Sequence, residues 1–148
     1  MGIASGAKNG AGCAGASTVE CLLDDEGCFF LMEMNTRLQV EHPVTEMVTG
    51  FDLVEWQVRV ACGERLPVRQ EGVRLSGHAI EARLCAEDEH FTPHSGQVLH
   101  FLPPPLGEGR GGGTGGTARV RGLRIDHAIH PGLEVPPYYD SMLGKVIA

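Results

Sequence analysis

The chain has 148 residues, a length that lets a single domain bury roughly two-thirds of the surface that its unfolded chain exposes. Its net charge of −7 provides no basic stripe for a nucleic-acid or anionic-membrane partner, so we expect neither. The sequence has no recognisable signal peptide and no apolar run of about 18 residues, which predicts a soluble, intracellular protein.

Residues 1–16 are rich in Gly, Ala and Ser and have few side chains that can fill a core. Such a composition is typical of a flexible segment. We therefore expect these residues to form a flexible lead-in without chemistry.

Two β-prone runs, residues 18–23 and 28–34, flank the turn-forming residues 24–27 and predict an antiparallel hairpin. If the last two turn residues form the centre of the loop, Glu20 lies directly opposite Glu33. Opposed Cβ atoms are about 4.5–5.5 Å apart, close enough for both carboxylates to bind one cation. Mg²⁺ and Mn²⁺ are the hard ions that prefer such oxygens. The alternative is a charged hairpin at a sheet edge.

Polar and apolar residues alternate from Glu33 to Glu41, a period of two that is typical of a strand. The polar face would carry Glu33, Asn35, Arg37, Gln39 and Glu41. A fully extended run would separate its ends by about 26 Å, too far for one small-molecule site. We expect a strand to about Asn35, then a curved loop that brings the later polar residues back and ends at Pro43, with His42 extended. The alternative is a strand with a solvated, charged face.

Residues 44–63 change to a helical period. The apolar residues that recur at this spacing are Leu53, Val54, Val58 and Ala61. Asp52 and Glu55 resemble a capping box, and Gly63 is a suitable stop. We expect a helix that packs on the sheet and supports the site without entering it.

Residues 75–85 alternate again and predict a strand with Glu81 and Arg83 on one face. From this pattern alone, Arg83 is a surface arginine that pairs with Glu81. Residues 91–102 predict a loop and a short strand, and the Pro- and Gly-rich residues 103–116 predict a disordered loop.

Short strands are expected to resume at residues 122–128 and 133–135. Tyr138 and Tyr139 are interpreted as packing residues. The last residues, 142–148, are expected to form an unpaired sheet edge that invites aggregation.

The five cysteines are odd in number and include no Cys-x-x-Cys pair, so neither a disulfide framework nor a zinc ribbon is expected. We interpret them as reduced thiols that are mostly buried. His90 and His94 are four residues apart, but Pro93 opposes the helix that would bring them onto one metal.

The run EMNTRLQVEHPVTE, residues 33–46, closely resembles the signature of biotin carboxylases, members of the ATP-grasp superfamily. The resemblance continues through residues 77–88 and 135–145. It implies an α+β fold, in which residues 17–73 are the C-terminal portion of an ATP-grasp domain with an antiparallel hairpin and a helix. Residues 74–148 would be part of the β-rich biotin carboxylase C-terminal domain, with a Gly-rich insertion near 106–120.

The resemblance implies roles on the nucleotide side of the site. Glu20, Glu33 and Asn35 would hold Mg²⁺ or Mn²⁺ on the phosphates of ATP. Leu22 would contact the adenine.

The resemblance also implies roles on the bicarbonate side. Arg37, the Gln39 side chain and the Val40 backbone would bind bicarbonate, and Glu41 would be the general base that deprotonates it. Arg83 would stabilise the anionic intermediates near biotin.

The implied activity is the ATP- and bicarbonate-dependent carboxylation of biotin on a carrier protein, for an acyl-CoA carboxylase of the methylcrotonyl, propionyl or acetyl type. The implied partners are a biotin carboxyl carrier protein or domain, a carboxyltransferase subunit and a second copy in a homodimer, in the cytoplasm or the mitochondrial matrix. Because the resemblance starts partway into the family's domain, we expect a C-terminal fragment that is inactive alone. The alternatives are another ATP-grasp ligase and a non-catalytic folding or dimerisation remnant.

Overall fold

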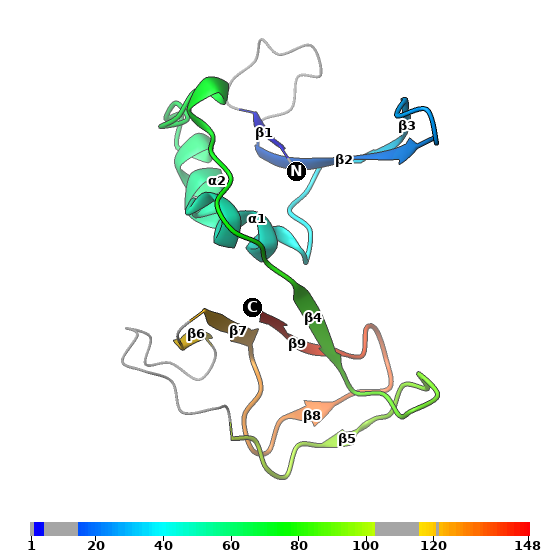
Figure 1. The fold of residues 1–148 in the computed structure, drawn as a ribbon. Helices are drawn as coiled ribbons and strands as arrows, with labels where there is room; N and C mark the ends of the chain where they lie inside the picture. The colour runs from blue at the N-terminus through cyan, green and yellow to red at the C-terminus, as the bar shows by residue number, and fades with distance from the viewer. Residues whose placement is uncertain (1, 5–14, 103–115, 121) are drawn as a thin grey trace. The chain divides into compact units, whose positions relative to one another are not determined.

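The computed structural model describes residues 2–4, 15–102, 116–120 and 122–148. The chain divides into two compact units, Met1–Ala79 and Ile80–Ala148, which are described separately. The first unit holds two α-helices and a three-stranded sheet, and the second holds sheets of four and two strands (Figure 1). Every described strand pair is antiparallel, so the expected α+β class is confirmed.

The sheet of the first unit has the order β1–β2–β3. Its strands are β1 Gly2–Ala4, β2 Gly15–Leu23 and β3 Phe29–Asn35. The expected flexible lead-in is wrong for residues 2–4 and 15–16, because β1 pairs with the start of β2 and Ala16 is buried. Composition missed this pairing because small side chains also suit strands that pack closely. Residues 5–14 lie outside the described part.

The hairpin between β2 and β3 closes on a three-residue loop. Asp24 N–H donates to Cys28 O at 3.1 Å, and the Asp24 carboxylate accepts from the Glu26 and Cys28 N–H groups at 3.0 and 2.8 Å. Gly27 adopts a φ of +84°, which an L side chain would resist. The loop centre therefore lies at Glu26, half a residue before the expected position.

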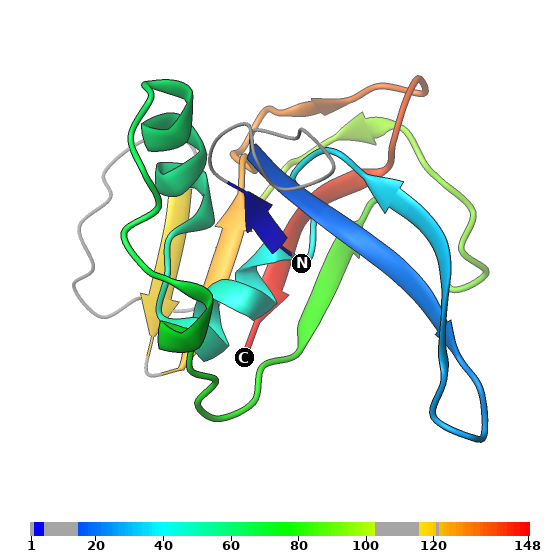
Figure 2. The ribbon, with the colours of Figure 1, turned by 90° about the horizontal axis from the view of Figure 1, so that it is seen from above.

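Farther from the loop, a β-bulge shifts the pairing by one residue and restores the predicted register. Cys21 pairs with Leu31, but the next pair is Glu20 with Glu33, so Met32 is the extra residue on β3. Without this bulge, Glu20 would face Met32. Figure 2 shows the two strands running side by side as a long, twisted hairpin.

Two helices, α1 His42–Thr49 and α2 Leu53–Ala61, replace the helix expected within residues 44–63. His42 begins α1, so its expected extended conformation is wrong. Pro43 occupies the first turn, where a missing N–H is tolerated. Gly50 ends α1 in the left-handed conformation, at φ +74°.

The capping signals of α2 are confirmed. The Asp52 side chain accepts from Glu55 N–H at 2.8 Å, as in an N-cap. Gly63 has a φ of +87° just after the last turn, as expected for a stop. Leu53, at the first position of α2, is buried and anchors the helix in the unit.

The main sheet of the second unit has the order β4–β9–β7–β6, and β5 pairs with β8. The strands are β4 Glu81–Cys85, β5 Gly96–Gln97, β6 Gly116–Val120, β7 Leu123–His127, β8 Glu134–Val135 and β9 Met142–Ile147. The expected unpaired edge at residues 142–148 is wrong, because β9 lies between β4 and β7. Among the described residues of the second unit, Ile125 of β7, Ile147 of β9 and Ile129, which follows β7, are the buried apolar residues.

The regular part of the strand expected at residues 75–85 begins only at Glu81. Residues 103–115 of the Pro- and Gly-rich loop expected at 103–116 lie outside the described residues, and its last residue, Gly116, begins β6. The whole of β6 falls within the insertion predicted near residues 106–120. β6 pairs with β7, so this part of the predicted insertion adds a strand to the sheet.

Two expectations about burial are wrong. Cys21, Cys28 and Cys62 are exposed free thiols, and Cys85 is half-buried. Tyr138 and Tyr139 are 69% and 100% exposed, because they lie in a bend outside the strands. Among the described residues, no helix has the length and apolar character needed to cross a membrane.

Candidate functional site

The carboxylates of Glu20 and Glu33 converge on one side of the β2–β3 hairpin. The two residues are direct cross-strand partners, and the Asn35 side-chain Nδ2 donates to Glu20 Oε1 and to Glu33 Oε1, both at 2.9 Å. The predicted placement on one face is therefore confirmed. Two like charges at this separation favour a cation between them.

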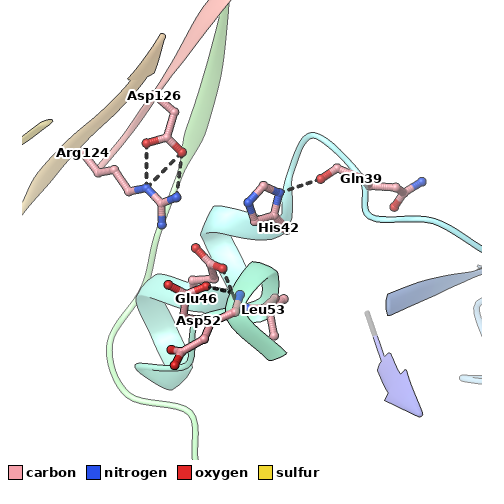
Figure 3. Close-up of polar contacts among 8 residues, drawn as sticks. Gln39, His42, Glu46, Asp52, Leu53, Arg124 and Asp126 are labelled. Atoms are coloured by element: carbon pink, nitrogen blue, oxygen red, sulfur yellow. Dashed lines mark hydrogen bonds and ion pairs between the residues drawn. The ribbon is translucent and has the colours of Figure 1, made fainter. Parts of the chain in front are cut away.

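The segment after β3 turns back toward this pair. The Gln39 side-chain Nε2 donates to Glu20 Oε1 at 3.2 Å, so the expected return of the loop is confirmed for Gln39. The Gln39 carbonyl oxygen lies 2.8 Å from His42 Nδ1 and accepts from the His42 N–H at 3.3 Å (Figure 3). These contacts fix the end of the loop to the start of α1.

The predicted base, Glu41, occupies the N-cap position of α1. Its carbonyl oxygen accepts from Val44 N–H at 3.1 Å, while its side chain is exposed. Val40 precedes it in the same turn. The N-terminus of a helix favours a negative charge, so a carboxylate or a bound anion is well placed here.

Arg37 is exposed in the middle of the loop, where its guanidinium donates to Leu38 O at 3.3 Å. Among the described residues this long contact is the one hydrogen bond of the Arg37 side chain, which leaves most of its donors for an anion. Leu22 lies two residues after Glu20 on β2 and is 59% exposed. Alternation along β2 therefore puts Leu22 on the face of Glu20.

Arg83 lies in the second unit, on β4, with Lys145 of β9 as its cross-strand partner. Its role near biotin stays a prediction.

The donor set at the hairpin fits a hard divalent cation. Two carboxylate oxygens approach the same Asn35 nitrogen, and turning this amide over by 180° would present its oxygen to a cation as a third ligand. Among the described residues there is no group of three or more His, Cys, Asp or Glu side chains suited to a metal, so the amide is needed to complete this set.

The sequence did not reveal a buried carboxylate on α1, the helix that begins where the loop ends. Glu46 of α1 is 7% exposed, and its Oε1 accepts from Leu53 N–H at 2.7 Å (Figure 3). This bond joins the two helices at the start of α2. No local pattern links these residues, because they are seven positions apart across a break in the helix.

In the second unit, two further polar clusters have structural roles. Arg124 donates from Nε and Nη2 to the Asp126 carboxylate at 2.7–3.0 Å, and both side chains are largely buried (Figure 3). The Asp88 carboxylate accepts from His94 and from the Thr92 and His90 N–H groups. These hydrogen bonds, led by that of His94, lower the pKa of Asp88 from its ordinary 3.8 to about 2.

Two family models match the chain. Residues 4–69 match the carbamoyl-phosphate synthase L chain, ATP binding domain, and residues 81–148 match the biotin carboxylase C-terminal domain. A biotin carboxylase of Nostoc sp. is 52% identical over 90% of this chain and 27% of its own length. The mitochondrial methylcrotonoyl-CoA carboxylase subunit alpha of Rattus norvegicus is 47% identical over 90% of this chain and 17% of its own length.

A solved structure of a biotin carboxylase domain is also similar to this chain. The biotin carboxylase domain of 2-oxoglutarate carboxylase from Hydrogenobacter thermophilus, a dimer in complex with MgADP, ADP and bicarbonate, is 43% identical with a TM-score of 0.76. That similarity covers 92% of this chain and 27% of the other. The chain thus spans between 17% and 27% of the length of these relatives.

Proposed function

Because this chain belongs to the biotin carboxylase family, we propose that its first unit contributes the magnesium-nucleotide and bicarbonate sites of an ATP-dependent biotin carboxylase. The observation that carries the proposal is that the Asn35 amide bridges Glu20 and Glu33 while the Gln39 side chain donates to Glu20. The reaction is the carboxylation of biotin on a carrier protein with bicarbonate and ATP.

On the nucleotide side, Glu20, Glu33 and Asn35 hold Mg²⁺ or Mn²⁺. When bound, the ion supplies positive charge that offsets the charge of the ATP phosphates. The Leu22 side chain offers an exposed apolar surface for the adenine. The bulge at Met32 is essential to this arrangement, because it brings Glu33 opposite Glu20.

On the bicarbonate side, the Arg37 guanidinium binds the planar anion through parallel hydrogen bonds, with the Gln39 amide and the Val40 backbone as neighbours. Glu41 accepts the bicarbonate proton, so that the bicarbonate oxygen can attack the γ-phosphorus of ATP. Since Gln39 also donates to Glu20, the anion loop and the metal carboxylates are held together by one hydrogen bond.

Arg83 and the second unit act in the later transfer to biotin, where a guanidinium stabilises the anionic intermediates. The proposed partners are the biotinylated carrier, a carboxyltransferase subunit and a second biotin carboxylase copy. Similar proteins include bacterial, chloroplastic and mitochondrial ones. We propose the cytoplasm or the mitochondrial matrix for this chain.

The experiment that tests the site is a titration of the purified chain with Mn²⁺, followed by electron paramagnetic resonance, with and without ATP. We expect binding that is lost in Glu20→Gln and in Glu33→Gln. Glu26→Gln, on the loop of the same hairpin, removes the same charge away from the site and should bind Mn²⁺ normally. Equal losses in all three variants would show that only the overall charge matters and would refute the site.

A further inference from the structure

A cavity with a mixed lining lies within the first unit, between the two helices and the chain that follows them, and Thr45 and Thr49 are among its polar lining residues. Its volume is about 160 Å³, and it is partly open to solvent. Its apolar lining consists of Phe51, Leu53, Trp56, Leu66, Val68 and Val73. After α2, the chain turns back along the helices (Figure 1). Residues of this returning segment, from Leu66 to Val73, line the cavity opposite the helices.

The inner wall of the cavity is held in place before any ligand arrives. The Phe51 and Trp56 rings lie 4.5 Å apart between centroids, with a tilt of 30°. Leu53 is 3% exposed, and its N–H is fixed by Glu46. A preformed apolar wall lowers the entropy lost when a ligand binds.

The Arg69 guanidinium lies at this cavity without an ion-pair partner among the described residues. Arg69 lines the cavity just before the short 3₁₀ helix Gln70–Gly72, and its side chain is exposed. Across the described part of the chain, neither the Arg69 guanidinium nor the neighbouring Gln70 amide forms a hydrogen bond or ion pair. A guanidinium has a planar set of donors that suits a carboxylate.

We propose that this cavity binds a small carboxylic acid, with its apolar body against Trp56 and its carboxylate on Arg69. The size of the body follows from the volume, because a dry cavity of about 150 Å³ in another protein holds benzene. A body of about six carbon atoms therefore fits. None of the residues proposed for magnesium or bicarbonate lines this cavity, so the inference stands apart from the proposed carboxylation.

Trp56 is the only tryptophan of the chain, which makes its fluorescence a direct report on the cavity. The probe is cyclohexanecarboxylate, added to the full 148-residue chain, since it does not absorb the exciting light. We expect a saturable change with a Kd of roughly 0.1–10 mM, the range for a ligand of this size. Arg69→Met should weaken binding about tenfold, as for the loss of a charged hydrogen bond.

Two comparisons separate the proposed site from unspecific binding. Arg65→Met removes the same charge from a neighbouring exposed residue that does not line the cavity, and it should bind like the wild type. Cyclohexanecarboxamide has the same shape without the charge. It should bind the wild type about tenfold more weakly than the acid, and it should not distinguish the wild type from Arg69→Met.

The inference is overturned if the amide binds as tightly as the acid, or if Arg65→Met and Arg69→Met have equal effects. It is also overturned if neither fluorescence nor calorimetric titration detects saturable binding when the acid is added at concentrations well above the expected Kd. Val73→Phe, which fills the cavity, should abolish binding while helical circular dichroism is retained. Should this variant fail to fold, the Arg69→Met and amide comparisons still decide.

Discussion

At the scale of single residues, the proposed chemistry depends most on Glu41, whose exposed carboxylate sits at the start of α1. In a full-length relative that carries this segment, we expect Glu41→Gln to preserve nucleotide binding. Bicarbonate-dependent ATP cleavage should fall about 10²–10⁴-fold, because a positioned general base contributes a factor of this size.

The measurement is phosphate release with and without bicarbonate, together with nucleotide affinity. Glu55→Gln, which neutralises an exposed carboxylate on α2, is the control and should retain activity. Unchanged turnover in Glu41→Gln would remove this residue from the role of base.

Asp88 offers a second test at a single residue. Its pKa is lowered to about 2, mainly by the hydrogen bond from His94. A carboxyl group with a lowered folded pKa stabilises the fold above its ordinary pKa of 3.8, and this contribution is lost as the pH falls through about 2.

We expect His94→Gln to raise the pKa of Asp88 toward 3.8, measured by a carboxyl NMR titration. His90→Gln is the matched control, because only the backbone N–H of His90 contacts Asp88. If both variants leave the titration unchanged, the His94 hydrogen bond is not the main cause.

At the scale of elements, α1 and α2 are joined by the buried Glu46 carboxylate. Glu46→Ala leaves Leu53 N–H without its acceptor in a buried place, and such a loss costs about 1–3 kcal/mol. We expect urea unfolding to show a decrease of this size. Glu46→Gln keeps a carbonyl oxygen and should cost less, so equal losses in the two variants would show that the charge, and not the hydrogen bond, matters.

The β2–β3 hairpin shows which features of an element can be predicted from the sequence. The pairing of Glu20 with Glu33 was predicted correctly, although the loop centre was misplaced. The bulge at Met32 offsets that error, and no residue pattern identifies a bulge of this kind. The return of Gln39 was predicted from strand length alone, because a straight strand could not form one site.

Other features depend on contacts that local patterns do not contain. The pairing of β1 with β2 joins residues 2–4 to 15–17, both parts of a segment whose composition suggests flexibility. The central position of β9 depends on β4 and β7, which are distant in sequence. The bond from Glu46 to Leu53 crosses the gap between two helices. Tertiary packing, not propensity, decides all three.

At the scale of the whole molecule, the most unusual surface is the β2–β3 hairpin. Eight of its apolar side chains are 39–74% exposed: Val19, Leu22, Leu23, Phe29, Phe30, Leu31, Met32 and Met34. β3 is also the last strand in the order β1–β2–β3. An apolar strand at a sheet edge offers both unpaired backbone groups and hydrophobic surface to another chain.

We therefore expect the 148-residue chain to self-associate through this hairpin as its concentration rises. Leu31→Lys puts a charge on the edge strand, which opposes edge-to-edge pairing, so it should shift the chain toward monomer. Sedimentation velocity over a range of concentrations measures the change. Val58→Lys on α2, where the side chain is 61% exposed, adds the same charge to an exposed apolar site away from the hairpin. If Val58→Lys shifts the chain toward monomer as much as Leu31→Lys does, net charge governs the association and the hairpin does not.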